Sequence, residues 1–97
     1  MKTFKEIKNI IQKHKDELRK KYKVQETGIF GSYVRDDQTP TSDVDILVEF
    51  SEPISLLDRA SLLNYLKELL GINVDLVRKR QVRPELKESI LREVVYL

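Results

Sequence analysis

The sequence predicts an α+β fold, in which a small mixed sheet of three to four strands carries helices packed on one face. The chain contains three amphipathic stretches, with apolar residues at steps of three and four, and three short stretches typical of strands, in the order helix, strand, strand, helix, strand, helix. The chain has 97 residues and contains no internal repeat, no linker and no low-complexity tract. We therefore expect a single domain over residues 1–97.

The first element is predicted to be an amphipathic helix over residues 4–21. Thr3 and Glu6 form a capping box at its start, in which each side chain can accept a hydrogen bond from the other residue's backbone N–H. Its apolar seam consists of Phe4, Ile7, Ile11, His14 and Leu18. A lone histidine on such a seam is expected to be a half-buried packing residue rather than a ligand.

Two strands and a turn are predicted in the middle of the chain. Side chains of residues 24–30 form two alternating sets, as in a short strand, and Gly31-Ser32 then interrupts the pattern. Ser32 is expected to be the N-cap of a single helical turn. Residues 43–50, DVDILVEF, are β-branched and aromatic and lie between turn residues, so they predict the strongest strand of the chain.

The second half predicts a helix, a strand and a last helix. Ser55 and Asp58 form another capping box, and Gly71 is suited to end the helix that follows it. The expected apolar face of this helix is Leu56, Leu57, Ala60, Leu63, Leu66 and Leu70. Residues 72–77 predict the third strand, and Pro84 suits the first turn of the last helix. The residues expected to face inward from that helix are Leu86, Ile90, Leu91, Val94 and Val95.

The composition narrows the classes of function. The chain has no cysteine, which excludes disulfides, thiolate zinc sites and cysteine nucleophiles, and its single histidine excludes a multi-histidine metal site. Charges interrupt the apolar residues of the N-terminal stretch and no long apolar run occurs, so we expect a cytosolic protein without a secretory signal or membrane span. The basic residues are not interleaved with aromatic residues, so direct nucleic-acid binding is not expected.

Acidic residues gather in the middle of the chain, where residues 24–77 hold ten Asp or Glu against three Lys or Arg. Asp43 and Asp45 are two apart on a predicted strand, so both project with Leu47 to the side away from the core. Asp75 lies inside the third strand and completes a three-carboxylate cluster if the two strands are neighbours. Such a cluster suits two Mg²⁺ ions, because Mg²⁺ prefers oxygen ligands and two metal ions together can stabilise the attacking and leaving oxygens in phosphoryl transfer.

The Gly31-Ser32 turn predicts a nucleotide-binding loop. Glycine lets the backbone approach a ligand, and the amides at a following helix start favour an anion. Ser32 adds a hydroxyl donor, and Arg35, one turn further on, can bring a guanidinium to the same phosphate. The sequence therefore predicts a phosphate cradle and a cation site close together, as a nucleoside triphosphate requires.

The segment GIFGSYVRDDQTPTSDVDILVEF contains Gly-Ser, a ten-residue gap and Asp-x-Asp, and it resembles the signature of the DNA polymerase beta-like nucleotidyltransferase superfamily. The short chain and the run from Gly31 to Asp45 resemble the minimal nucleotidyltransferase (MNT) branch in particular. The resemblance covers residues 24–77, including Asp75, and implies the minimal version of the nucleotidyltransferase fold. Many minimal members have glycine directly after the arginine, where this chain has Asp36.

The resemblance also implies roles for the site residues. By this likeness, Asp43 and Asp45 bind two Mg²⁺ ions together with the triphosphate of ATP. Asp75 binds the catalytic metal and helps to activate the attacking hydroxyl, and Gly31-Ser32 holds the β- and γ-phosphates. Minimal members are commonly antitoxins of HEPN-domain toxins, and some transfer AMP onto a toxin tyrosine. The resemblance therefore implies a Mg²⁺-dependent protein adenylyltransferase with a HEPN toxin as its partner.

Two alternatives stay open at this point. The chain could be a non-catalytic antitoxin that neutralises its toxin by binding, although three retained carboxylates argue against an idle site. It could also be a nucleotidyltransferase for a small molecule, such as an aminoglycoside, or for an RNA end.

Overall fold

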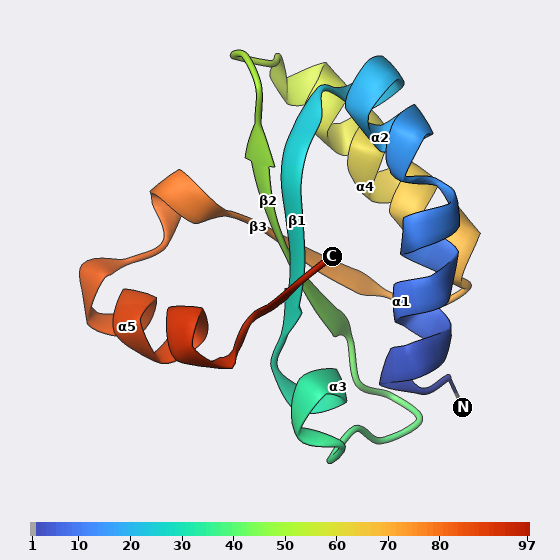
Figure 1. Ribbon diagram of the computed structural model, residues 1–97, viewed down its shortest axis with the longest axis vertical. Helices are drawn as coiled ribbons and strands as arrows, with labels where there is room; N and C mark the ends of the chain where they lie inside the picture. The colour runs from blue at the N-terminus through green and yellow to red at the C-terminus, as the bar shows by residue number, and fades with distance from the viewer. Residues whose placement is uncertain (1) are drawn as a thin grey trace.

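The computed structural model describes residues 2–97, in which five α-helices surround a four-stranded sheet (Figure 1). The helices are α1 (Phe4–Lys13), α2 (Lys15–Tyr22), α3 (Ser32–Arg35), α4 (Leu56–Leu70) and α5 (Pro84–Glu93), with a 3₁₀ turn η1 (Lys79–Gln81). The strands are β1 (Val24–Phe30), β2 (Val44–Phe50), β3 (Val74–Arg78) and β4 (Val95–Tyr96). The predicted α+β class and mixed sheet are confirmed. None of the described helices is both long and apolar enough to cross a membrane.

The strands are ordered β3-β2-β1-β4 across the sheet. β1 is antiparallel to both β2 and β4, whereas β2 and β3 are parallel and are connected through α4. A parallel pair needs such a crossover, because the chain must return to the starting end of the sheet before the second strand can run in the same direction as the first. The topology therefore makes β2 and β3 neighbours and leaves β3 as an edge strand.

Helices α1, α2 and α4 pack on one face of the sheet and enclose the main core (Figure 1). Each of these helices contributes apolar residues at helical spacing. Every second residue of β2 points toward the helices and packs against these side chains. The most deeply buried of these side chains are Ile7, Ile11, Leu18, Val44, Ile46, Val48, Leu62, Leu66 and Leu70. At about 1.5–3 kcal/mol for each fully buried aliphatic side chain, this layer is the main source of stability.

The predicted helix over residues 4–21 is interrupted at His14, whose φ of −108° and ψ of 13° are not helical. The His14 ring Nδ1 donates a 2.8 Å hydrogen bond to the backbone carbonyl of Ile10, four residues earlier. A side-chain donor that takes this carbonyl competes with the regular backbone hydrogen bond, which ends α1 and starts α2. The half-buried ring also packs edge-on against Tyr65, so its predicted packing role is confirmed.

The predicted apolar face of α4 is partly wrong. Leu56 and Leu57 are 84% and 83% exposed, and Ala60 is also exposed. The buried stripe instead consists of Leu62, Leu66 and Leu70. Leucines occur on several sides of this helix, so helical spacing alone allowed more than one buried stripe, and contact with α1 and β3 selected this one.

The opposite face of the sheet is covered by the end of the chain, so Leu47 is only 1% exposed. Gly28 is the cross-strand partner of Leu47 and shares its face, and a Cβ on Gly28 would lie 2.5 Å from Val94 Cγ2. α5 lies on this side of the strands in Figure 1. The prediction that the apolar residues of the last helix all face inward is wrong, since α5 has no buried residue and Leu86 and Leu91 are exposed. Val94 and Val95, which were expected on this helix, lie beyond its end, and Val95 belongs to β4. α5 bounds the face without packing tightly against it.

Candidate active site

Asp45 and Asp75 lie side by side, because they are direct partners in the parallel pairing of β2 with β3. Aligned residues of adjacent strands point to the same face, so both carboxylates project to the side opposite α1, α2 and α4. Asp45 is half-buried and Asp75 is exposed. Asp43 immediately precedes β2 and is exposed as well. The fold therefore brings together two acidic residues that are thirty positions apart in the sequence.

The neighbouring acidic residues change the pKa of Asp45. Burial, followed by the negative charge of Asp75, raises the pKa of Asp45 from 3.8 to about 6. Asp75 can also accept a hydrogen bond from the protonated Asp45 carboxyl, and the charge of Asp43 acts in the same direction. The positive charge of Arg35 opposes the shift. All three acidic residues and one arginine therefore act on a single location.

The three carboxylates do not form a closed cage. Across residues 2–97, no group of three Asp, Glu or His side chains is close enough to hold a metal ion without rearrangement. Asp45 and Asp75 are the adjacent pair, and Asp43 acts on Asp45 through its charge. Mg²⁺ needs only one or two protein carboxylates when phosphate and water complete its coordination. The donor set thus fits a hard divalent cation bound together with a nucleotide.

Gly31 is held directly against the carboxylate of Asp45. Its φ of 82° and ψ of −153° lie in a region that essentially only glycine adopts. A Cβ at this position would lie 2.0 Å from Asp45 Oδ2, well inside van der Waals contact. The turn after β1 therefore requires glycine for two independent reasons, its backbone conformation and its closeness to Asp45.

Ser32 is the first residue of α3, and Gly31 is the N-cap, so the predicted capping role of Ser32 is wrong. The backbone N–H groups of Val34 and Arg35 donate to the Gly31 carbonyl at 3.1 and 3.2 Å. No side chain caps this helix start. The half-buried Ser32 hydroxyl therefore does not serve as the cap of this helix.

Arg35 is anchored by two acidic residues. Its Nε donates to Asp37 Oδ2 at 3.3 Å and its Nη1 donates to Glu93 Oε1 at 2.5 Å, and these bonds, chiefly that to Glu93, raise the pKa of Arg35. Glu93 is the last residue of α5, and no local signal in the sequence pointed to it. Asp36, where many minimal nucleotidyltransferases have glycine, adopts a left-handed conformation with a φ of 61°. The loop keeps the shape that glycine favours although its residue is aspartate.

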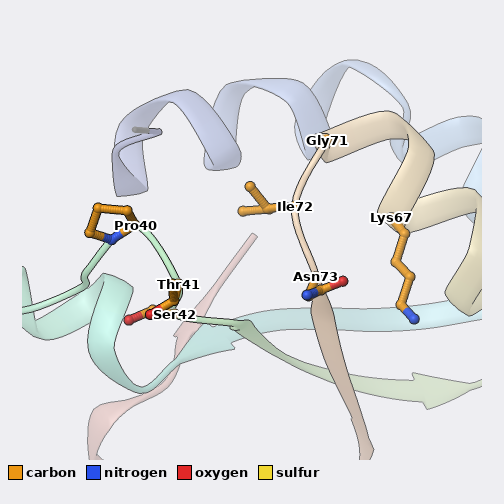
Figure 2. A pocket seen from close by; sticks show the side chains of 7 residues that line it. All are labelled: Pro40, Thr41, Ser42, Lys67, Gly71, Ile72 and Asn73. Carbon is orange, nitrogen blue, oxygen red and sulfur yellow. The ribbon is translucent and has the colours of Figure 1, made fainter.

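A hollow of about 350 Å³ borders the loop that leads to Asp43 (Figure 2). It lies between this loop and the connection from α4 to β3, and Figure 2 shows Lys67 and Asn73 on the side opposite Pro40, Thr41 and Ser42. Its lining residues are Pro40, Thr41, Ser42, Lys67, Gly71, Ile72 and Asn73. None of the three carboxylates lines it, so this hollow is separate from the acidic site.

Residues 11–97 match the family model described as a nucleotidyltransferase domain. A protein adenylyltransferase of Thermococcus cleftensis, MntA, is 50% identical over 97 residues, which cover 100% of this chain and 98% of that protein. A solved structure described as a minimal nucleotidyltransferase is 34% identical with a TM-score of 0.76, covering 94% of this chain and 95% of the other.

Two solved toxin–antitoxin complexes are also similar. One, with AMP-PNP, is 28% identical with a TM-score of 0.72, covering 93% of this chain and 70% of the other. The second is a tri-AMPylated Shewanella oneidensis HEPN toxin in complex with an MNT antitoxin. It is 25% identical with a TM-score of 0.67, again covering 93% of this chain and 70% of the other.

Proposed function

The chain belongs to the nucleotidyltransferase domain family, and on this basis we propose that it transfers AMP from ATP to a hydroxyl of a partner protein. The expected acceptor is a tyrosine of a cognate HEPN-domain toxin, which the modification would silence. The chain would then be the antitoxin of the pair. The similar complexes, one with an ATP analogue and one with an AMPylated HEPN toxin, support this assignment.

The observation that carries the proposal is the position of Asp45. Its carboxylate is flanked by Asp75 on the neighbouring strand and by the bare backbone of Gly31. An acidic pair next to a glycine turn provides separate places for cations and for phosphate oxygens. A purely steric antitoxin would have no need of this arrangement, in which like charges lie close together at a cost in stability.

The reaction is a displacement at the α-phosphorus of ATP. The acceptor oxygen forms a new bond to this phosphorus, the bond to the β-bridging oxygen breaks, and pyrophosphate leaves with that oxygen's electron pair. Asp75, the more exposed carboxylate of the pair, would receive or orient the hydroxyl proton. Ser32 and the backbone beside Gly31 would hold the β- and γ-phosphates in line with the acceptor.

Asp43, Asp45 and Asp75 are the residues that would hold Mg²⁺. When bound, Mg²⁺ supplies positive charge that lowers the pKa of the acceptor hydroxyl and neutralises the leaving pyrophosphate. The protein itself aligns the reactants. Arg35, fixed by Glu93, would add a positive charge on the phosphate side of the site.

The test is a labelling experiment. The purified chain is incubated with α-labelled ATP, Mg²⁺ and the cognate HEPN toxin, with an Asp45→Asn variant as control. Label on the toxin that the variant does not produce supports the proposal. A tight complex without label would instead identify a steric antitoxin, and label on an RNA or a small molecule would identify a different acceptor class.

A further inference from the structure

An apolar groove runs between α4 and the outer edge of β3. It is about 410 Å³ in volume, and its lining residues are Leu56, Arg59, Ala60, Leu63, Val74, Asp75 and Leu76. Leu56 and Ala60 are exposed, in contrast to the buried leucines on the core side of the same helix. Asp75 belongs to this groove and also to the acidic pair with Asp45. Asp75 therefore adjoins both the groove and the candidate active site, with its carboxylate on the sheet face opposite α4.

The groove is bordered by unpaired backbone of the edge strand. The Val44 N–H donates to the Asn73 carbonyl at 3.0 Å, so Asn73 and, by strand alternation, Asp75 turn their backbone groups toward β2. Val74 and Leu76 accordingly turn theirs outward. Arg59 Nη2 donates to the outward Leu76 carbonyl at 3.2 Å. Among residues 2–97, the structure records no partner for the Leu76 N–H or for either backbone group of Val74.

These features fit an extended polypeptide. A strand that pairs with an open sheet edge satisfies the free backbone groups, and its side chains alternate between the two faces of the sheet. On one face they would meet Leu56, Ala60 and Leu63. On the other they would meet Asp75 and, beyond it, Asp45. One added strand can therefore anchor itself through apolar residues while it presents a hydroxyl to the acidic pair.

We propose that this groove binds an extended segment of the acceptor protein, which adds to β3 as a fifth strand and presents its hydroxyl-bearing residue to Asp75. The inference rests on the proposed function, because the reaction requires an acceptor at Asp75. A second copy of this chain fits less well, since it would bring a second acidic cluster to the same edge and like charges there repel.

The first test uses a matched pair of variants, Leu56→Asp and Leu57→Asp. The two leucines are adjacent and almost equally exposed at the start of α4, where an added carboxylate favours the helix, so neither change should disturb folding. Only Leu56 lines the groove. We expect Leu56→Asp to raise the KM for the cognate HEPN toxin at least tenfold and Leu57→Asp to leave it unchanged. Circular dichroism and ATP affinity are measured in parallel to verify folding.

The second test is residue-resolved amide hydrogen exchange, with and without the toxin. Binding should slow exchange at the outward N–H groups of Val74 and Leu76, whereas Asp75 and Val77 already point toward β2. The measurement needs no turnover, so it tests the groove even if the native chain binds the toxin without labelling it.

The proposal would be overturned if Leu56→Asp and Leu57→Asp had the same KM for the toxin, whether unchanged from the native chain or raised equally in both. Unchanged exchange at Val74 and Leu76 in the toxin complex would overturn it as well. If exchange at Val74 and Leu76 became slower as the concentration of the chain alone was raised, the edge would bind a second copy, and the proposal would also be overturned. A selective loss in Leu56→Asp together with slowed exchange on toxin binding supports it.

Discussion

Replacing Gly31 by alanine tests most directly how the fold builds the site. The glycine backbone lies in a region that costs other residues about 1–3 kcal/mol. The new Cβ would also lie 2.0 Å from Asp45 Oδ2, where contacts below 3.0 Å essentially never occur, so the carboxylate has to move by at least the 1.0 Å difference. A displacement of about 1 Å in a catalytic group can lower the rate by about 100-fold.

We therefore expect two separable effects of Gly31→Ala. The free energy of unfolding should fall by about 1–3 kcal/mol, which lowers the melting temperature by roughly 5–20 °C in a domain of this size. AMP transfer to the toxin should fall by at least about 100-fold at a temperature where the variant is fully folded. Thermal unfolding followed by circular dichroism and initial rates with α-labelled ATP measure the two effects.

Gly71→Ala is the matched control. Gly71 also has a positive φ, of 69°, but nothing lies within 4 Å of its Cβ position. The substitution should cost about 1–2 kcal/mol of stability and leave transfer unchanged. Transfer by folded Gly31→Ala within threefold of the native rate would refute the reasoning, and so would an equal loss in Gly71→Ala, because the effect would then follow from stability alone.

Three further experiments test the electrostatics, the loop and the core. Because the pKa of Asp45 is raised from 3.8 to about 6 on folding, its stabilising protonation is present below pH 4 and lost as the pH rises through about 6. The pKa shift corresponds to at most about 3 kcal/mol, which solvent screening of this half-exposed carboxyl reduces to about 1 kcal/mol. Asp45→Asn should therefore stabilise the metal-free chain above pH 6, as measured by denaturant titration with chelator. The same substitution should abolish transfer, because it removes a carboxylate that would hold Mg²⁺. Asp36→Gly should stabilise the chain by about 0.5–1 kcal/mol in the same titrations, since it relieves a left-handed conformation, and a loss of stability would contradict this. Leu62→Ala should cost about 2–5 kcal/mol and Leu57→Ala less than about 0.5 kcal/mol, and similar values for the two would show that the buried stripe of α4 is misassigned.

Much of the local structure followed from the sequence. The strands 24–30 and 43–50 and the helix that ends at Gly71 have the expected type and nearly the expected bounds, because turn residues delimit them and apolar periodicity identifies them. The alternation along β2 also placed Asp45 correctly on the face opposite α1, α2 and α4, since strand geometry fixes side-chain direction residue by residue.

The faces of α4 and the break at His14 did not follow from the sequence. A helix with leucines on several sides is compatible with more than one buried stripe, and only packing against α1 and β3 selected Leu62 over Leu56. The break depends on a ring-to-carbonyl hydrogen bond that competes with the helix, and periodicity does not record such competition.

By itself the chain determined which residues carry acidic groups, which turn contains the Gly31-Ser32 pair, and which segments become strands, because these depend on neighbours within a few positions. The tertiary structure decided the rest: that Asp45 stands next to Asp75, that Glu93 holds Arg35, and that β3 has an open edge beside Leu56. These contacts join positions far apart in the sequence. They form only when strands pair and the chain end folds over the sheet, so their geometry comes from the global packing and not from any local pattern.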